Sequence, residues 1–549
     1  MMRKISLVIS GLLLAGCASL PNGINVEIGP ELTAPEQQEL SFYSPASPIP
    51  GATPGEIVSG FLSAGTGPQN DYEVAREYLT DGFATRWRPG EQTLIRVGAY
   101  DLQSGSDEVQ IVSVMVGARV NADGSFDNIT PTTTNLRFRL TKEDGEWRIS
   151  SAPNLTVVTV PVFEVVFSQF PIYFLDSTAS QLVPDVRWFP KRSSTPTQLV
   201  TALLNGPARW LSESVLSAIP AGTQLQVNAV LVQEGRALVD LDSTALAADN
   251  RQRGLLLTQL RSTLLQLPSI VDVTVLIAGA EQNITAAEIP AIPASTVYAL
   301  TDSGILRLSG SEAGPVVGTE KVTESLSANR LAVGQGGSDF VLVSSSGAYR
   351  VAEDDGIFAA RKVSSTSLIS DVQVDSFGNT WLFRSTNTGT VEIIDSSNKS
   401  SEVVLPFSGN VVSAAISPEG SRLAVVISDS GQTVQLFGIV RNQQGAPLRL
   451  TGNLVAEPEA VGVSSLTWQS STVLRILSTT SSGTGSIYDY PISGPRKQRT
   501  APLITGSVIE AGFAAIDSYL LSETGEVWML SGNTWQRLQT QVADISTAR

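Results

Sequence analysis

The sequence contains no histidine and only one cysteine among its 549 residues. Without histidine, the chain can form no Ser-His-Asp or Cys-His nucleophile system, no imidazole general base and no metal site with a histidine ligand. The single cysteine, Cys17, excludes an intramolecular disulfide, a thiolate zinc cluster and a redox pair within the chain. Most common hydrolase mechanisms are excluded, and we expect no catalytic residues, no cofactor and no metal site.

Charged residues are also scarce, at 16% of the chain, and they are unbalanced. There are 36 Lys and Arg against 52 Asp and Glu, which gives a net charge of −16. Binding to nucleic acid, or to anionic lipid head groups by charge alone, depends on clustered cations. The composition therefore predicts no nucleic-acid partner. At about 150 residues per domain, the length predicts three or four folded domains.

The cysteine lies at the end of a secretory-type leader. Arg3 and Lys4 precede an apolar run over residues 5–15, which is shorter than the roughly 20 residues that span a bilayer as a helix. The residues Leu14-Ala15-Gly16-Cys17 resemble the bacterial lipobox. This resemblance implies a signal peptide over residues 1–16 and lipidation of Cys17, as S-diacylglycerol and N-acyl groups. We expect a lipid-anchored protein on the extracytoplasmic face of the cell membrane, since two or more acyl chains anchor stably.

Residues 17–52 have no sustained apolar period. They contain six prolines, which disfavour helix and packed sheet: Pro21, Pro30, Pro35, Pro45, Pro48 and Pro50. This segment is predicted to be an extended tether.

The block over residues 53–159 begins with a helix-start signature. In Thr53-Pro54-Gly55-Glu56, Thr53 and Glu56 can form a capping box and Pro54 suits the first helical position. A second helical stretch is predicted near residues 72–79. Strands are predicted over 94–100, 110–121, 136–142 and 146–150, the last two joined by an Asp-Gly turn at residues 144–145. Two helices followed by an antiparallel sheet resemble the NTF2-like α+β architecture; no convergent polar set indicates a pocket, so a scaffold role is preferred.

The block over residues 160–290 alternates helix and strand patterns. Strands are predicted over 172–175, 186–189, 224–233, 236–241 and 270–277, and helices over 196–204 and 249–267. Leucines at near-helical spacing predict a core-facing stripe on the second helix: Leu256, Leu260, Leu264 and Leu267. Its arginines, Arg251, Arg253 and Arg261, lie off this stripe. A solvated helix face is the preferred interpretation of them, and an anion site is the alternative.

The block over residues 291–549 contains an internal repeat. Glycines between paired strand-like runs recur at steps of 43, 42, 42, 52 and 42 residues: Gly304, Gly347, Gly389, Gly431, Gly483 and Gly525. About 42 residues suit the four short strands of one β-propeller blade, so the spacing predicts about six blades. The long step is predicted to hold an inserted loop around residues 442–458, and Ser417-Pro418-Glu419-Gly420 a type I turn. A pair of β-sandwiches is the alternative architecture.

A search for chemistry in these blocks finds no convincing site. The Ser-x-x-Lys match at Ser396 and Lys399 lies in a predicted loop, where that spacing brings no hydroxyl and amine together. Asp240 with Asp242, and the acidic run at residues 353–356, lack the full oxygen series that Ca²⁺ requires. Four tryptophans of the repeat block could stack on sugars: Trp381, Trp468, Trp528 and Trp535. Core packing is the preferred role for Trp381 and Trp528.

The order of these blocks resembles a known family. Three runs resemble the GerMN domain: Leu203-Leu204-Asn205-Gly206-Pro207, Ile219-Pro220-Ala221-Gly222-Thr223 and Ala237-Leu238-Val239-Asp240-Leu241, followed by the leucine-rich helix. With the lipobox and the predicted propeller, the chain is identified as a member of the actinobacterial lipoprotein LpqB family. The fold class expected is therefore multidomain and mainly β, with an NTF2-like α+β domain, an α/β GerMN-like domain and a β-propeller of about six blades.

The family implies a partner. Its members are associated with the MtrA/MtrB two-component system, in which they contact the extracytoplasmic domain of the sensor kinase MtrB and affect cell-wall homeostasis and cell division. The main hypothesis is non-catalytic modulation of an MtrB-like kinase, with Cys17 the only functional residue that the resemblance transfers. A peptidoglycan-binding module without a signalling partner is the alternative. An enzyme has no positive support, and a solute-binding lipoprotein is disfavoured because two repeated βαβ lobes are missing.

Overall fold

The computed structural model describes residues 45–355, 357–479, 485–502, 504–511 and 518–548. Cys17, the leader and most of the predicted tether lie outside the described residues, as does the predicted glycine turn at Gly483. The last residues of the predicted tether, 45–52, form neither helix nor strand. They nevertheless contact the first domain, because Tyr78 Oη donates to the carbonyl of Ala46 at 2.7 Å and the Gly51 amide to Glu146 Oε2 at 2.8 Å.

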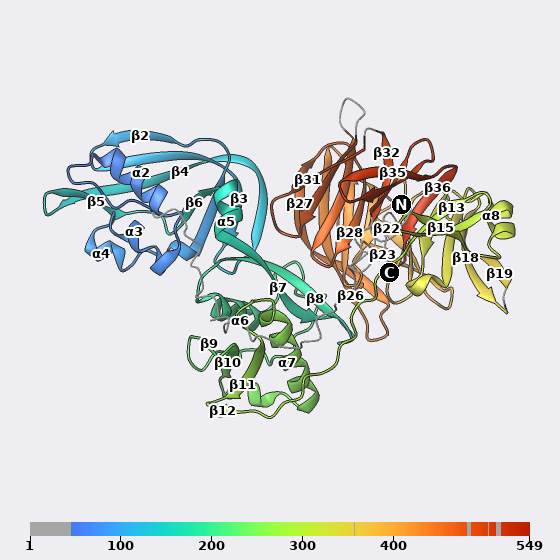
Figure 1. The fold of residues 1–549 in the computed structure, drawn as a ribbon, viewed down its shortest axis with the longest axis horizontal. Coiled ribbons are helices and arrows are strands. Elements are labelled where there is room, and N and C mark those ends of the chain that lie inside the picture. Colours follow the sequence, from blue (N-terminus) through green and yellow to red (C-terminus); the bar gives the residue numbers. More distant parts are fainter. Residues whose placement is uncertain (1–44, 356, 480–484, 503, 512–517, 549) are drawn as a thin grey trace, which may run out of the picture. The chain divides into compact units, whose positions relative to one another are not determined.

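The first domain packs a capped helix on a curved sheet (Figure 1). Helix α2 (Pro54–Ala64) begins with the predicted capping box between Thr53 and Glu56, and its buried face packs on the strands. The sheet has the order β5-β4-β3-β1-β6, with β2 paired to β3. Its strands are β1 (Gln92–Arg96), β2 (Asp101–Ser106), β3 (Val109–Asn121), β4 (Phe126–Glu143), β5 (Glu146–Ser151) and β6 (Thr156–Thr159).

The second predicted helix of this domain is wrong as one continuous element. Residues near 72–79 form only α3 (Glu73–Arg76), while η1 (Gln69–Asp71), α4 (Asp81–Ala84) and η2 (Pro89–Glu91) are separate short turns. The physical reason is a competing pairing: the Ile149 amide donates to the Tyr78 carbonyl, and the Thr80 amide donates to the Ile149 carbonyl. Residues 78–80 therefore join the edge of the sheet. The Asp-Gly turn at 144–145 is confirmed, with positive φ at both residues.

The second domain consists of a long two-stranded ribbon and a small mixed sheet. Strands β7 (Phe167–Leu175) and β8 (Leu182–Pro190) form the ribbon, and the sheet has the order β12-β11-β10-β9. Helix α7 (Asn250–Leu264) has a capping box at Asp249, and its predicted leucine stripe is buried. The remaining elements are α5 (Val160–Val166), α6 (Thr195–Asn205), β9 (Leu231–Gln233), β10 (Arg236–Leu241), η3 (Ser243–Ala247), β11 (Asp272–Ile277) and β12 (Ala280–Glu281). The predicted strand over 224–233 is mostly wrong, since only its last three residues form β9.

The third domain is a β-propeller. Described residues 297–547 form six four-stranded sheets, which confirms the repeat and excludes the sandwich pair. The inner strands contact one another in a ring. The C-terminal strand closes it, because β36 pairs with β13 of the first blade.

The blades, each from its inner strand outward, are β36 (Val542–Thr547) with β13 (Val297–Thr301), β14 (Gly304–Ser309) and β15 (Glu312–Pro315); β16 (Arg330–Val333), β17 (Asp339–Ser344), β18 (Gly347–Asp354) and β19 (Ile357–Ser364); β20 (Ile369–Val374), β21 (Thr380–Arg384), β22 (Thr390–Ile394) and β23 (Ser400–Val404); β24 (Asn410–Ile416), β25 (Arg422–Ser428), β26 (Gln432–Arg441) and β27 (Pro447–Ala460); β28 (Val463–Ser470), β29 (Val473–Thr479), β30 (Gly485–Pro491) and β31 (Lys497–Arg499); and β32 (Gly506–Ala511), β33 (Ser518–Ser522), β34 (Val527–Ser531) and β35 (Thr534–Gln539). The short α8 (Glu320–Leu326) and η4 (Gln335–Gly337) lie between strands.

Neighbouring inner strands are joined by side chains that accept backbone N–H groups. Asp371 Oδ2 accepts from the Ala414 amide at 2.7 Å, and Asp544 Oδ2 accepts from the Leu331 amide at 2.8 Å. Serine hydroxyls do the same between the next blades: Ser413 with the Leu466 amide and Ser465 with the Ile509 amide. Ser413 and Ser465 directly precede Ala414 and Leu466, whose own amides donate to the previous blade, so the same strand position links these three blade pairs.

The closing strand contains a carboxyl group whose protonation should affect stability. Burial raises the pKa of Asp544 from 3.8 to about 7; nearby Asp371 and Glu510 raise it further, while Arg330 and the Leu331 amide oppose the shift. Between these two values, the unfolded chain loses a proton that the folded chain keeps. Stability should therefore fall as the pH rises from about 4 to about 7, by roughly 4 kcal/mol at 1.36 kcal/mol per pKa unit.

Replacing Asp544 by Asn keeps the carbonyl acceptor for Leu331 and removes the titration. We expect Asp544→Asn to lose less stability than the wild type between pH 5 and pH 7.5, measured by urea unfolding at both pH values. The exposed Asp302→Asn serves as the control, because it removes one charge from the same propeller. Equal pH dependence in Asp544→Asn and wild type would contradict the role of Asp544.

Candidate functional site

Strand β8 lies at a buried junction between all three domains. Except for Leu182, every residue of β8 is buried. Trp188 packs on the first domain, with its ring centroid 6.0 Å from that of Phe126, and the Trp188 amide donates to the carbonyl of Gly124 at 2.8 Å. The indole N–H of the same residue donates to the carbonyl of Ser493 in the propeller. A single side chain therefore contacts both flanking domains.

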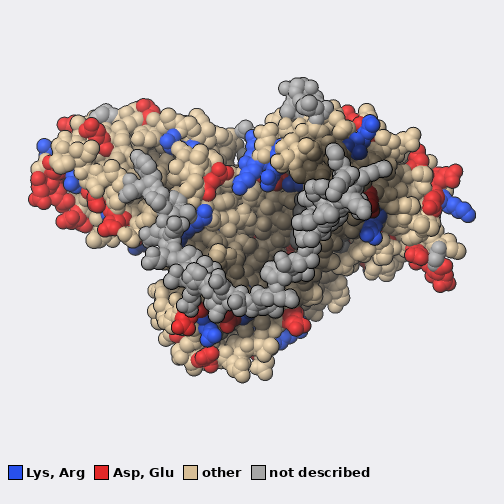
Figure 2. All heavy atoms as spheres, viewed as in Figure 1, with Lys and Arg blue, Asp and Glu red and all other residues tan. Residues whose placement is uncertain are grey.

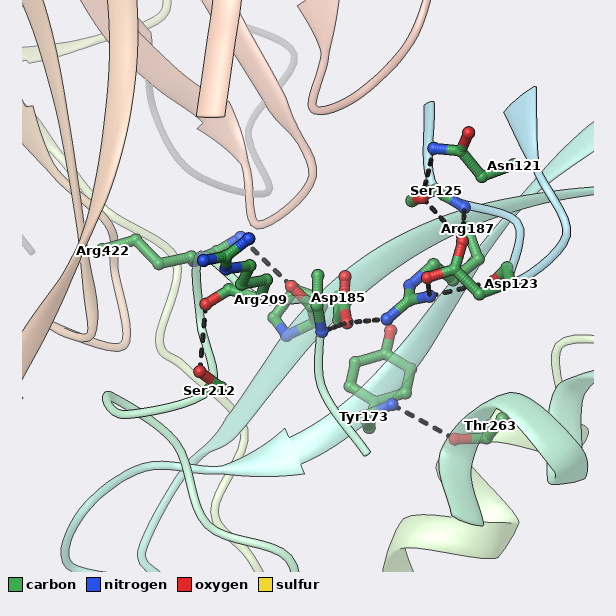
Figure 3. A network of polar contacts seen from close by, with 12 residues as sticks. Asn121, Asp123, Ser125, Tyr173, Asp185, Arg187, Arg209, Ser212, Thr263 and Arg422 are labelled. Carbon is green, nitrogen blue, oxygen red and sulfur yellow. Dashed lines mark hydrogen bonds and ion pairs between the residues drawn. The ribbon is translucent and has the colours of Figure 1, made fainter. Parts of the chain in front are cut away.

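Two charged residues of β8 extend this junction (Figure 3). Arg187 Nη2 lies 2.8 Å from Asp185 Oδ2, and both side chains are almost fully buried. Arg187 Nη1 lies 2.9 Å from Asp123 Oδ2 and also donates to the Asp123 carbonyl, in the turn between β3 and β4. Asp185 Oδ2 in turn accepts from the Ala208 amide at 2.6 Å, just after α6. The ion pairs thus connect the first and second domains.

The electrostatics of this group favour its charged form. Burial opposes the charge on Arg187, but the carboxylates of Asp185 and Asp123 outweigh it and raise the pKa of Arg187 above its ordinary value. Burial likewise acts to raise the pKa of Asp123, but hydrogen bonds from Ser125 and the contact with Arg187 hold that pKa below its usual range. Paired in this way, Arg187 and Asp123 remain ionised.

The propeller contributes a second buried ion pair beside β8. Arg422 Nε lies 2.6 Å from Glu419 Oε1, and both side chains are fully buried. Arg422 Nη1 donates to the carbonyl of Pro184 at 3.4 Å, and its guanidinium lies 4.6 Å from the ring centre of Trp468. The predicted type I turn is confirmed by the Gly420 amide, which donates to the Ser417 carbonyl at 2.8 Å. This turn positions Glu419, which the sequence marked only as a turn residue.

A third ion pair holds the neighbouring turns together. Arg441 Nη2 lies 2.8 Å from Asp375 Oδ2, which also accepts from the Trp381 indole. The other nitrogens of Arg441 donate to the carbonyls of Gly420 and Gly445. Burial lowers the pKa of Arg441, although Asp375 acts against this shift. One guanidinium therefore joins three turns on the same face of the propeller.

The extra residues in the 52-residue step of the repeat also contact the other two domains at this junction. The predicted loop around residues 442–458 is wrong, because the extra residues lengthen β26 and form the 14-residue strand β27. Thr451 Oγ1 donates to Glu213 Oε1 of the second domain at 3.1 Å, and Asn128 of the first domain donates to the Ala456 carbonyl at 2.8 Å. Pairing with β26 satisfies the backbone of this segment, which explains why it forms a strand. The insertion is therefore a domain contact.

The apolar core is continuous across the same boundary. One cluster of buried side chains contains Leu199 and Leu260 of the second domain together with Ala424 and Trp468 of the propeller. Interfaces within a chain permit domain motion unless they are large and apolar. The second domain and the propeller therefore form one packed body.

The other sequence candidates do not converge on a site. Ser396 and Lys399 lie in the turn between β22 and β23, where the Asp395 amide donates to the Lys399 carbonyl. Asp242 caps η3, and Asp240 accepts from the Gly279 amide. Gly356 lies outside the described residues. Across the described segments, no group of three or more His, Cys, Asp or Glu side chains could hold a metal ion.

The arginines of α7 also lie apart from one another. Arg261 pairs with Asp272, Arg253 donates to the carbonyls of Ala248 and Leu246, and Arg251 is exposed. This arrangement agrees with the solvated face rather than an anion site. On the side of the molecule in Figure 2, acidic side chains gather over the part of the first domain that carries α4 and β5. No helix in the described residues is long and apolar enough to cross a membrane.

The predicted tryptophan roles are only partly confirmed. Trp381 and Trp468 are almost completely buried, whereas Trp528 and Trp535 are half-buried. Trp381 is therefore a core residue as predicted, but Trp528 is not fully enclosed.

Comparison with known families assigns all three domains. Residues 47–164 match the family described as "Lipoprotein LpqB, N-terminal domain". Residues 171–283 match the Germane family, which is described as "Sporulation and spore germination". Residues 303–545 match the lipoprotein LpqB beta-propeller domain. The chain is therefore a mainly β protein that combines a Germane domain with a C-terminal propeller. It belongs to the actinobacterial lipoprotein LpqB family.

Relatives from several actinobacteria carry the name lipoprotein LpqB. The Thermobifida fusca protein is 31% identical over 53% of this chain, and the match spans about half of that protein, 49%. The Bifidobacterium longum protein is 27% identical over 80% of each chain. The Streptomyces coelicolor protein is 25% identical over 99% of this chain and 97% of its own.

Two solved structures show weaker likeness. TolB from Acinetobacter baumannii is 10% identical, with a TM-score of 0.37 over 72% of this chain and 90% of that chain. The first GerMN domain of GerM from Bacillus subtilis is 22% identical, with a TM-score of 0.19 over 22% of this chain and 94% of that chain. The NTF2-like resemblance of the first domain stays a prediction.

The junction predicts a large cost for breaking the Glu419–Arg422 pair. Glu419→Ala leaves Arg422 charged and fully buried, which should destabilise the protein by about 3–5 kcal/mol. Replacing both residues by Met should recover much of this loss, because no unpaired charge remains. The measurement is the midpoint of urea unfolding.

The matched control is the exposed pair between Glu213 and Arg449 at the same domain boundary. Glu213→Ala should leave the midpoint nearly unchanged, because water already screens that pair. If Glu419→Ala behaved like Glu213→Ala, the buried pair would not support the junction.

Proposed function

We propose that the protein is a membrane-anchored, extracytoplasmic lipoprotein that modulates an MtrB-like sensor kinase of an MtrA/MtrB-type two-component system. It acts in cell-wall homeostasis and cell division, by binding and without catalysis. The observation that carries the proposal is the order of the chain: the lipobox-like Leu14-Ala15-Gly16-Cys17 precedes the three domains matched by the family comparisons.

Binding alone can modulate a kinase only if it distinguishes kinase states. Tenfold tighter binding to one state shifts the equilibrium by about 1.4 kcal/mol. A lipid anchor on Cys17 confines the protein and the kinase to one membrane and so raises their effective concentration. A body with a continuous core presents a fixed surface. Because that surface is already ordered, little conformational entropy is lost on binding.

The anchor can be tested directly. Cys17→Ser should abolish incorporation of a palmitate analogue and move the protein from the membrane fraction to the soluble fraction. Ser19→Ala, two residues away, is the matched control and should stay labelled and membrane-bound. Retention of Cys17→Ser in the membrane fraction without label would contradict lipidation as the anchor.

The partner can be tested with the lipidated protein and the full-length kinase in the same liposomes. We expect co-capture with the kinase and a change in its autophosphorylation rate. No co-capture and no rate change would contradict the proposal. Sedimentation of the protein with purified peptidoglycan, without any kinase effect, would instead support the alternative of a cell-wall binding module. That alternative is weakened by the burial of Trp381 and Trp468.

A further inference from the structure

A cavity opens between the fourth and fifth blades of the propeller. It has a volume of about 240 Å³ and is lined by residues from β26 to β30 and the chain that follows. The cavity lies beside a bulge in the pairing of β26 with β27: Gln432 pairs with Ala460, but Val434 already pairs with Glu457, so the register shifts between them. The same insertion that contacts the other domains therefore creates this opening.

The lining divides into an aliphatic floor and a polar rim. Val434, Val463 and Ile476 are buried and form the floor, while Val461 lies at the opening and is 78% exposed. Sites for drug-sized ligands have volumes of about 300–1,000 Å³. A volume of about 240 Å³ is below that range and suits one apolar side chain.

The rim contains a hydrogen-bonded group of three side chains. Tyr490 Oη donates to Glu457 Oε2, and Arg496 Nη1 donates to the same carboxylate oxygen at 3.1 Å. The Arg496 guanidinium lies 5.0 Å from the ring centre of Tyr488. Burial and the bond to Glu457 raise the pKa of Tyr490, so it remains a neutral donor at physiological pH. Within the described chain, the bonds of Arg496 use Nη1 and leave Nε and Nη2 for a ligand.

We propose that this cavity binds one aliphatic side chain of an extended segment of a protein partner, whose flanking carbonyls accept from Arg496. The inference rests on the proposed function, in which that partner is the extracytoplasmic domain of the kinase. Anchor residues in well-packed pockets contribute much of the affinity of protein interfaces. The site is continuous with the existing domain boundary, since Ala456, next to Glu457, accepts from Asn128 of the first domain.

The test places a charge at the opening without disturbing the fold. Val461→Arg should weaken binding of the lipidated protein, held in nanodiscs, to the kinase ectodomain by about tenfold, or about 1.4 kcal/mol, because the charge blocks entry of the anchor side chain. Val317→Arg is the matched control, since Val317 is 79% exposed in the chain between β15 and α8, outside the cavity lining. It should change the dissociation constant less than about twofold. Unfolding midpoints show that both variants are folded.

A second pair of variants tests the rim. Arg496→Ala should weaken binding by about threefold to tenfold. Its neighbour Lys497 lies opposite Asp489 in the ladder between β30 and β31. Asp489 and Tyr488 point to opposite faces of β30, so Lys497 lies on the face away from Tyr488 and Lys497→Ala should leave binding unchanged. If Val461→Arg and Arg496→Ala bind the kinase as the wild type does, this inference alone is wrong. If the wild type does not bind the kinase, the proposed function fails and the inference fails with it.

Discussion

The charged side chain of Arg187 is buried, and it remains stable only because carboxylates from two domains surround it. Asp185 lies on the same strand, but Asp123 comes from the turn between β3 and β4. Removing either carboxylate would leave the buried guanidinium with one counter-ion instead of two, which should destabilise the folded protein. The orientation of the first two domains therefore depends on this network, and the packing of Trp188 beside it follows from the same constraint.

The propeller contacts this junction through its fourth blade, which is longer than the regular repeat. Arg422 reaches the backbone of β8, and the long strand β27 contacts both other domains. A regular 42-residue blade would lack these extra residues. The departure from the repeat thus provides the domain contacts and, through the shifted pairing of β27, the cavity. The domain contacts and the proposed binding cavity therefore lie together at the fourth and fifth blades.

The sequence predicts what depends on local geometry. Glycines at regular spacing predict the blades, and the capping boxes at Thr53 and Asp249 predict the starts of α2 and α7. The junction depends on pairs distant in sequence, such as Arg187 with Asp123, and no local pattern indicates which charges will meet. The alternation of Leu448, Arg449, Leu450 and Thr451 was a signal for β27, but the repeat length favoured a loop. At residues 78–80 a local pattern gives the wrong result, because backbone pairing with the distant Ile149 replaces the helix that the sequence predicts there.

The ladder between β13 and β36 joins Val297 to Thr547, so the first blade contains the last strand of the propeller. During synthesis the N-terminal segments emerge first, yet β13 has no inner neighbour until β36 has been made. Any chain that stops before residue 542 therefore leaves an open sheet edge able to pair with other unfolded chains. The arrangement makes complete synthesis of the chain a condition of a closed ring, and it exposes interrupted products to proteolysis.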